Sequence, residues 1–259
     1  FVRRGLNYNT RLVEEAGLDP DTPPVTWDEV LEWHKALTKF DSAGNLVQFG
    51  LDPYDAEGGT GPGNDGWFAT ESWGLTYFDE DTKTFALDNE LLAESMEVMG
   101  EFVKIIGPDN LVGMRSVEGQ GTWGGAFNAE VQAMIIEGYW HPGETVNEKP
   151  EVAPYNRATW VPVPESRRGT KIQFGGGHMA MIFKDGQYKD EAWPIAEWIQ
   201  SEYVCNLIFD KIGWLPAYLP YFEKADKQKY PGLDFYFNSV QEATFWGPFI
   251  RNEIQSFVE

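Results

Sequence analysis

Apolar residues along the chain recur at helical spacing in some segments and form short continuous runs in others. Thr26 and Glu29 form a capping box ahead of an apolar stripe, which predicts a helix that ends near Lys39. Further helices are expected over Thr10–Ala16, from a cap at Asp88 to Ile106, and over Glu191–Gln200, Glu202–Ile212 and Gln241–Val258. Strands are expected over Val47–Leu51, Ala133–Ile136, Trp160–Val163 and Met179–Phe183. Because strands alternate with helices, the expected fold class is α/β.

The stretch from Phe127 to Trp140 is the most informative part of this pattern. A short helix with a polar face leads into the apolar strand Ala133–Ile136, and Gly138, Tyr139 and Trp140 follow. In open α/β proteins, ligands collect just beyond the carboxyl ends of strands. An aromatic ring there suits a sugar, which has an apolar face and many hydroxyl groups. The alternative, that both rings only fill a core, stays open.

Composition narrows the classes of partner. The 259 residues are enough for one large domain or two small ones. Aromatic residues make up 15% of the chain, including 11 tryptophans, which is more than a core needs. The formal net charge of −21 repels nucleic acid and anionic membrane surfaces. We therefore expect no nucleic-acid partner.

Cysteine and histidine usage argues against a metal centre. Cys205 is the sole cysteine, so no internal disulfide can form, and the three histidines show no zinc-site spacing. No apolar run approaches the ~18 residues of a membrane-spanning helix. The chain has no initial Met and no signal-peptide pattern. Its start reads like the middle of a protein, so we expect a piece of a longer one.

Several motifs resemble a known family. They occur in this order: Leu6-Asn7-Tyr8-Asn9, Glu15-Ala16-Gly17-Leu18-Asp19 and Pro24-Val25-Thr26-Trp27-Asp28-Glu29; Phe127 to Trp140; Phe174 to Met181; Glu191 to Ile199 with Gly213-Trp214-Leu215-Pro216. Together they resemble the extracellular solute-binding proteins of bacterial ABC importers, in the sugar-binding group that includes maltose-binding protein. The resemblance covers nearly the whole chain.

The resemblance implies a type II periplasmic-binding-protein-like fold. Two α/β lobes are joined by crossing strands, and a hinge closes them on a ligand in the cleft. Residues 1–174 would form the first part of the C-terminal lobe, starting at the hinge crossover. Residues 175–221 would be a remnant of the N-terminal lobe, and residues 222–259 would return to the C-terminal lobe. The rest of the N-terminal lobe, one wall of the cleft, would precede this chain, so weak binding is expected of the chain alone.

The resemblance also implies which rings meet the ligand. Trp140 stands where sugar binders of this family place a stacking aromatic, and Trp246 matches a second such position. The alternative left open here is that Phe245 is the core partner. Trp67 follows a glycine-rich loop and would face the cleft or cap the core of the lobe. Four other tryptophans lie at helical spacing among apolar residues and are expected to pack in the core or on the surface: Trp27, Trp33, Trp193 and Trp198.

Polar contacts to hydroxyl groups are expected from three places. Adjacent glycines allow backbone amides to approach a ligand closely, with an ordinary loop as the alternative. Histidine side chains can donate hydrogen bonds, with plain solvent exposure as the alternative. A loop carboxylate makes strong charge-assisted bonds, although most loop carboxylates are only solvated. The expected polar contacts are Gly176, Gly177, His178, His141, Tyr54 and Asp55.

The function implied is capture of a carbohydrate in the cleft, without chemistry, and delivery to the permease subunits of an ABC importer. No cofactor and no metal is expected, and the protein is expected to be a monomer. Its expected location is the periplasm, or the cell exterior as a tethered lipoprotein. The alternative is a glycoside hydrolase, which needs a carboxylate pair at a defined separation; the sequence offers no such pair. A weaker alternative is an adhesin or scaffold.

Overall fold

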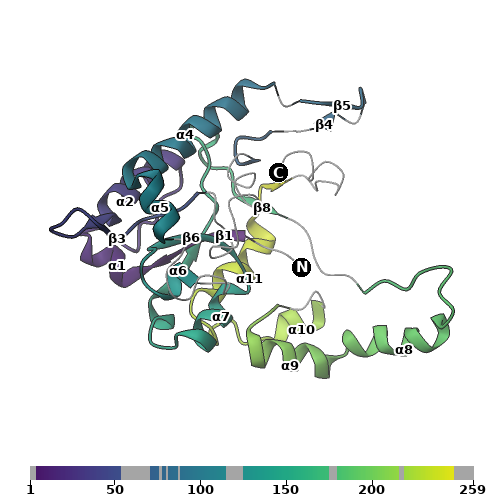
Figure 1. The fold of residues 1–259 in the computed structure, drawn as a ribbon. Coiled ribbons are helices and arrows are strands. Elements are labelled where there is room, and N and C mark those ends of the chain that lie inside the picture. Colours follow the sequence, from purple (N-terminus) through teal and green to yellow (C-terminus); the bar gives the residue numbers. More distant parts are fainter. Residues whose placement is uncertain are drawn as a thin grey trace.

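A three-stranded antiparallel sheet lies at the centre of the protein, for which we have a computed structural model (Figure 1). The structure describes residues 4–53, 71–75, 78–79, 81–86, 88–114, 125–174, 180–215 and 219–247. In the sheet, β1 (Arg4–Asn9) is flanked by β6 (Met134–Gly138) and β7 (Asn156–Thr159). Every residue of β1 and of β6 is buried, so both faces of this sheet are covered.

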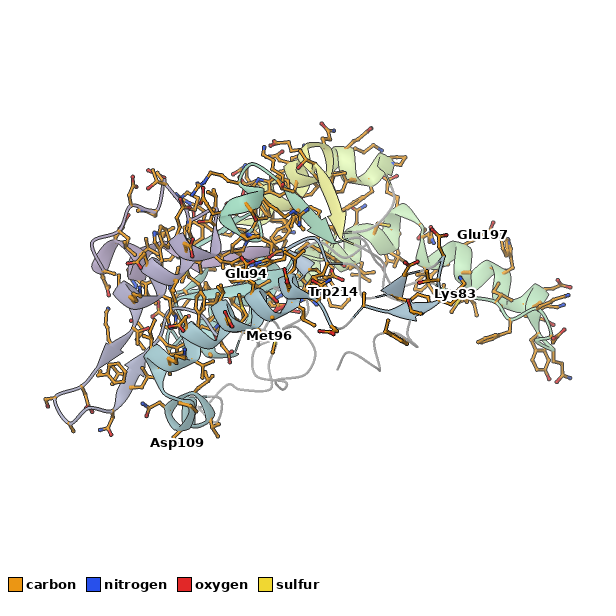
Figure 2. The ribbon with its side chains drawn as sticks, turned by 90° about the horizontal axis from the view of Figure 1, so that it is seen from above. Lys83, Glu94, Met96, Asp109, Glu197 and Trp214 are labelled. Atoms are coloured by element: carbon orange, nitrogen blue, oxygen red, sulfur yellow. The ribbon has the colours of Figure 1, made fainter. Side chains whose placement is uncertain are left out.

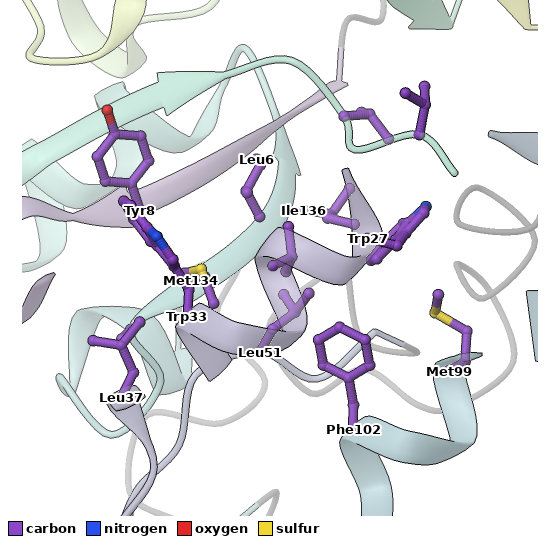
Figure 3. Close-up of a cluster of buried hydrophobic side chains, with 14 of the residues drawn as sticks. Leu6, Tyr8, Trp27, Trp33, Leu37, Leu51, Met99, Phe102, Met134 and Ile136 are labelled. Carbon is purple, nitrogen blue, oxygen red and sulfur yellow. The ribbon is translucent and has the colours of Figure 1, made fainter. Parts of the chain in front are cut away.

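Side chains on one face of the sheet meet the first helices. Leu6 and Tyr8 of β1 join Met134 and Ile136 of β6 in the main apolar cluster, because alternate residues of a strand point to the same face. The cluster is completed from α1 (Thr10–Glu15), α2 (Trp27–Leu37) and α4 (Glu90–Ile106). Figure 3 shows Trp27, Trp33 and Phe102 packed into it.

The expected capping box opens α2. The Thr26 hydroxyl accepts from the backbone N–H of Glu29, and the Glu29 carboxylate accepts from the backbone N–H of Thr26. Both bonds satisfy donors at the helix start that have no partner within the helix. Trp27 then stacks on Trp73 with ring centroids 5.9 Å apart and donates its indole N–H to Ser72. The box thereby fixes where the apolar face of α2 meets the core.

The opposite face of the sheet meets later elements. Tyr139 and Trp140 join a second apolar cluster with residues of α9 (Glu202–Ile212) and α11 (Leu233–Glu242). Between these helices lies α10 (Leu219–Lys224). Figure 1 shows α7 (His141–Glu148) and α11 on this side and α2 and α4 on the other. The central sheet is therefore sandwiched between two helical layers.

Smaller elements complete the described chain. Two antiparallel pairs are β2 (Lys39–Phe40) with β3 (Leu46–Gln48), and β4 (Phe78–Asp79) with β5 (Thr84–Phe85). The strands β8 (Ile172–Phe174) and β9 (Phe245–Gly247) pair in parallel. The remaining helical turns are α5 (Pro108–Met114), α6 (Gly125–Asn128), η1 (Ala153–Tyr155) and η2 (Glu165–Arg167).

The helix α8 (Lys189–Ile199) extends away from the rest of the described chain, and Glu197 lies near its inner end, toward α9 (Figure 2). It has no buried residue, and the side chains of Trp193 and Trp198 are 59% and 56% exposed. Large apolar side chains remain exposed from Met181 to Ile212. The sequence left core and surface packing open for these two tryptophans. Within the described residues, both lie on the surface.

Three expected elements are wrong in place or type. The strand expected over Trp160–Val163 lies earlier, in β7; Val163 forms only an isolated bridge to Thr26, and its side chain enters the core as extended coil. Residues 180–183 form no strand. Of the helix expected over Gln241–Val258, only Gln241 and Glu242 are helical, as the end of α11. Residues 245–247 instead pair with β8 as the strand β9, and residues 248–259 lie outside the described part.

Smaller differences concern element boundaries. The N-cap of α4 is Asn89, whose side chain accepts from the Leu91 backbone N–H, rather than the neighbouring Asp88. On that helix Leu91 and Met96 are exposed although their spacing suggested the buried side, and Ser95 is buried instead. The strand expected over Val47–Leu51 is the shorter β3.

Candidate functional site

The ring of Trp140 lies at the carboxyl end of β6, directly against Gly138. A Cβ atom built on Gly138 would come within 2.3 Å of Cζ3 and 2.4 Å of Cη2 of that ring. The absence of a side chain at this position is therefore what makes room for the indole. Trp140 is the N-cap residue of α7 and is only 8% exposed. Its burial against Tyr139 fits the core reading as well as that of a partly covered platform.

Two charged residues surround this ring. The Trp140 indole N–H donates to the Glu137 carboxylate. Arg4, the register partner of Gly138 on β1, places its guanidinium carbon 4.9 Å from the Trp140 ring centroid. A guanidinium nitrogen of Arg4 is 3.7 Å from Glu137 Oε1. Both charged side chains are buried, and such burial is tolerated only where charges are paired and hydrogen-bonded.

A polar network continues from this cluster into α11. The Asn7 amide donates to the Tyr236 hydroxyl oxygen at 2.8 Å, and that hydroxyl lies 3.1 Å from the Glu137 carbonyl oxygen. Burial raises the pKa of Tyr236, so its phenol stays protonated and can donate. The network links β1, β6 and α11 at the point where the chain enters the sheet.

His141, expected to face the ligand, is instead fully buried. Its ring lies 4.7 Å from the ring of Phe127, edge to face. Burial lowers the pKa of His141 to about 3, so the imidazole is neutral at physiological pH. Neither ring nitrogen has a hydrogen-bond partner in the described part of the chain. In this conformation His141 offers no surface to a ligand.

The position of Trp246 is described only through its backbone. It lies on β9 in register with Gln173 of β8. The Gln173 side chain is fully buried, and neither of its amide atoms has a partner among the residues described here. The other expected ligand contacts lie outside the described residues: Trp67, Tyr54, Asp55, Gly176, Gly177 and His178.

A separate cavity of about 410 Å³ lies between α9, α10 and the loop after α10. Its aromatic floor is Phe209 and Tyr221, and its rim carries the ion pair of Lys229 with Asp210. Rings and charges of both signs thus meet there. Trp140 does not line this cavity, although Phe209 and Tyr221 belong to the same apolar cluster as Trp140.

A comparison with protein-family models identifies the class of protein. Residues 2–202 match the model described as "Bacterial extracellular solute-binding protein". The chain belongs to this family. A search of curated proteins found no match. The family and the similar structures give no support to the hydrolase alternative.

Solved structures of other solute-binding proteins share this fold. CpMnBP1 with mannobiose bound has a TM-score of 0.82 and 20% identity, covering 98% of this chain and 62% of that one. A cyclic alpha-maltosyl-1,6-maltose binding protein from Arthrobacter globiformis has a TM-score of 0.63 and 23% identity, with coverages of 95% and 60%. The sugar-binding protein MalE from Xanthomonas citri has a TM-score of 0.64 and 16% identity, covering 99% of this chain and 61% of that one. This chain thus spans less than two thirds of the length of each.

The family fold is two-lobed and α/β, as the sequence predicted. The family name also implies a periplasmic or extracellular location. None of the helices described here combines the length with the apolar character that a membrane-spanning segment needs. Nor do the described residues contain a group of three or more metal-ligating side chains.

Sequence reasoning missed Arg4, Glu137 and Tyr236. One signal was available for Glu137, a carboxylate inside the run that ends β6, since a charge within a buried strand requires a partner. Identifying Arg4 as that partner requires the register between strands 130 residues apart.

Proposed function

We propose that this chain is part of the substrate-binding component of an ABC-type sugar importer, capturing a carbohydrate between two lobes without chemistry. The family match over residues 2–202 carries the proposal. Proteins with this fold have mannobiose bound or are named for the sugars they bind. Nearly all of this chain aligns with each of them. The protein is then no enzyme, and its partners are the carbohydrate and the permease subunits in the membrane.

The lobe assignment follows from the same proposal. Residues 1–174 and 222–259 form the C-terminal lobe, and residues 175–221 belong to the N-terminal lobe. Supporting this division, α8 lies in the middle segment and buries none of its side chains within the described chain. Exposed apolar surface of that extent marks a place where protein is covered by more protein. The parallel pairing of β8 with β9 brings the chain back beside the first segment.

The ligand site of this proposal is the edge where β6 ends and the crossing strands pass. Trp140 and Trp246 supply rings. The glycines and polar residues expected from the sequence, except the buried His141, supply hydrogen bonds. Because Trp140 is only 8% exposed, a sugar meets an edge of the ring or induces a small rotation. A micromolar ligand needs about 8 kcal/mol, which a few ring contacts of about 1 kcal/mol each cannot supply. The rest comes from hydrogen bonds in a closed cleft.

The proposal extends to state and place. The protein acts as a monomer, has no nucleic-acid partner, and resides in the periplasm or on the outer cell surface as a lipoprotein. Self-association measured by sedimentation would contradict the monomer.

The test is a thermal-shift and calorimetric screen against mono- and oligosaccharides. A ligand at 100 times its Kd stabilises the folded state by about 2.7 kcal/mol. Trp140→Phe is expected to reduce that shift. Trp73→Phe is the matched control, because Trp73 is also a buried tryptophan whose indole N–H bonds a carboxylate, that of Glu94. Cleavage of a chromogenic glycoside would overturn the proposal in favour of a hydrolase.

A further inference from the structure

Three groups surround the indole of Trp140: one at its N–H edge, one near the ring centroid and one at the ring carbons. Glu137 accepts the indole N–H, Arg4 lies 4.9 Å from the ring centroid, and the Gly138 backbone leaves room under the ring. Packing of the ring needs neither charge, and taking two charges out of water is costly unless they are paired and hydrogen-bonded.

Arg4 and Glu137 depend on each other. Glu137 is fully buried, so its carboxylate requires a cation nearby, and Arg4 supplies one at 3.7 Å. The position of Arg4 is fixed in turn by β1, where it is the register partner of Gly138. The Tyr236 hydroxyl lies 3.1 Å from the Glu137 carbonyl oxygen, so the backbone of Glu137 is anchored from α11 as well. The position of the carboxylate is thus fixed by contacts other than its hydrogen bond to the indole.

We propose that Glu137 and Arg4 are positioning residues for the Trp140 ring: the carboxylate fixes the edge of the indole, and the guanidinium fixes the carboxylate. This inference rests on the proposed function, since it treats Trp140 as the surface that a sugar meets. Neither charged group contacts the sugar itself. Their effect on binding is transmitted through the orientation of the ring, which sets the part of the indole that a sugar meets.

The test uses the 259-residue chain, labelled with ¹⁵N, and follows the indole N–H resonances by NMR. Trp140→Phe assigns the resonance of Trp140. Glu137→Leu is expected to move that resonance to the position of an indole without a carboxylate acceptor and to speed its hydrogen exchange. Glu137→Gln keeps an acceptor oxygen and is expected to restore protection. The double variant Arg4→Met, Glu137→Gln removes both charges together. It leaves no unpaired buried charge, so it is expected to fold and to give a measurable Trp140 resonance.

Titration with millimolar mannobiose then separates positioning from stability. We expect Glu137→Leu to weaken binding about tenfold, the effect of losing one charge-assisted hydrogen bond. Glu94→Leu is the control, because Glu94 accepts the indole N–H of Trp73 at 3.2 Å within the other cluster. It is expected to change stability without changing affinity.

Two results would overturn the inference. One is an unchanged Trp140 resonance in Glu137→Leu; the other is equal loss of affinity in Glu94→Leu. If mannobiose shifts no indole resonance in the unsubstituted chain, the proposed function fails for this disaccharide, and the resonance and exchange of Trp140 still decide the positioning.

Discussion

The backbone N–H of Leu51 donates to Nδ1 of His34 at 2.9 Å, which fixes the ring as an acceptor on that side. Its other nitrogen, Nε2, lies 3.2 Å from the Phe102 carbonyl oxygen and therefore carries the proton. The imidazole is thus a neutral bridge between α2, α4 and the residues after β3. A second proton on this ring would break the bond to Leu51.

This relationship predicts acid destabilisation. Burial lowers the pKa of His34 to about 4 and that of His141 to about 3. Because both values lie below that of an unfolded histidine, about 6.5, the unfolded state binds protons first as pH falls. The contribution of the two neutral histidines to the free energy of unfolding is therefore present above pH 6.5 and is lost as pH falls toward 4. Each histidine should cost about 2 kcal/mol by pH 4.5.

Urea unfolding at several pH values between 7.5 and 4.5 measures this loss. His34→Gln removes one titrating group and should flatten the slope, whatever it does to stability at pH 7.5. An unchanged slope in this variant would show that His34 has the same pKa in the folded and unfolded states.

A second prediction concerns the seat of the Trp140 ring. Gly138→Ala places a methyl group 2.3 Å from ring atoms, so the indole has to leave its position. Overpacking of this kind costs about 1–3 kcal/mol. Gly100→Ala is the control, because Gly100 lies within α4 with open space around it. It should stabilise the protein by roughly 0.5–1 kcal/mol through helix propensity. Equal unfolding midpoints for the two variants would contradict the contact with the ring.

Local signals predicted much of this structure, whereas long-range pairing escaped them. The capping box at Thr26 is read from four consecutive residues, and the structure contains both of its bonds. The strand β6 before Trp140 was also predicted from a local run of apolar residues. His141 was expected at the cleft because it follows Trp140, yet α7 turns its ring inward against Phe127. That direction depends on how the helix packs, which no local pattern encodes.

The same distinction explains α8. Trp193 and Trp198 lie at helical spacing among apolar residues, and the helix that this spacing predicts is present. The sequence does not say what covers these side chains, and in the described residues nothing buries them.

A third prediction uses the buried carboxyl of Glu71. Burial raises its pKa to about 9, and neither side-chain oxygen has a hydrogen-bond partner in the residues described. Its folded pKa exceeds the unfolded value, so its contribution is present below about pH 4.5 and is lost as pH rises toward 9. Glu71→Gln should therefore stabilise the protein by roughly 2 kcal/mol or more at pH 8.

Unfolding of Glu71→Gln at pH 5 and pH 8 tests this. The gain should be larger at pH 8, since glutamine cannot ionise in either state. Glu97→Gln is the control, because it removes the same charge from the exposed surface of α4. A gain that is equal at both pH values would mean that Glu71 ionises normally.

The last prediction separates two tryptophans that the sequence placed in one group. Trp27 is 1% exposed, stacks on Trp73 and donates to Ser72 at 2.7 Å. Trp27→Ala should cost about 3–5 kcal/mol, because it opens a cavity and leaves a buried hydroxyl without its donor. Trp198→Ala, on the exposed α8, should change the free energy of unfolding by less than about 0.5 kcal/mol in this chain. Denaturant unfolding of both variants measures the difference. A cost above 1 kcal/mol for Trp198→Ala would mean that its side chain is buried in solution, by another part of the chain or by a second copy.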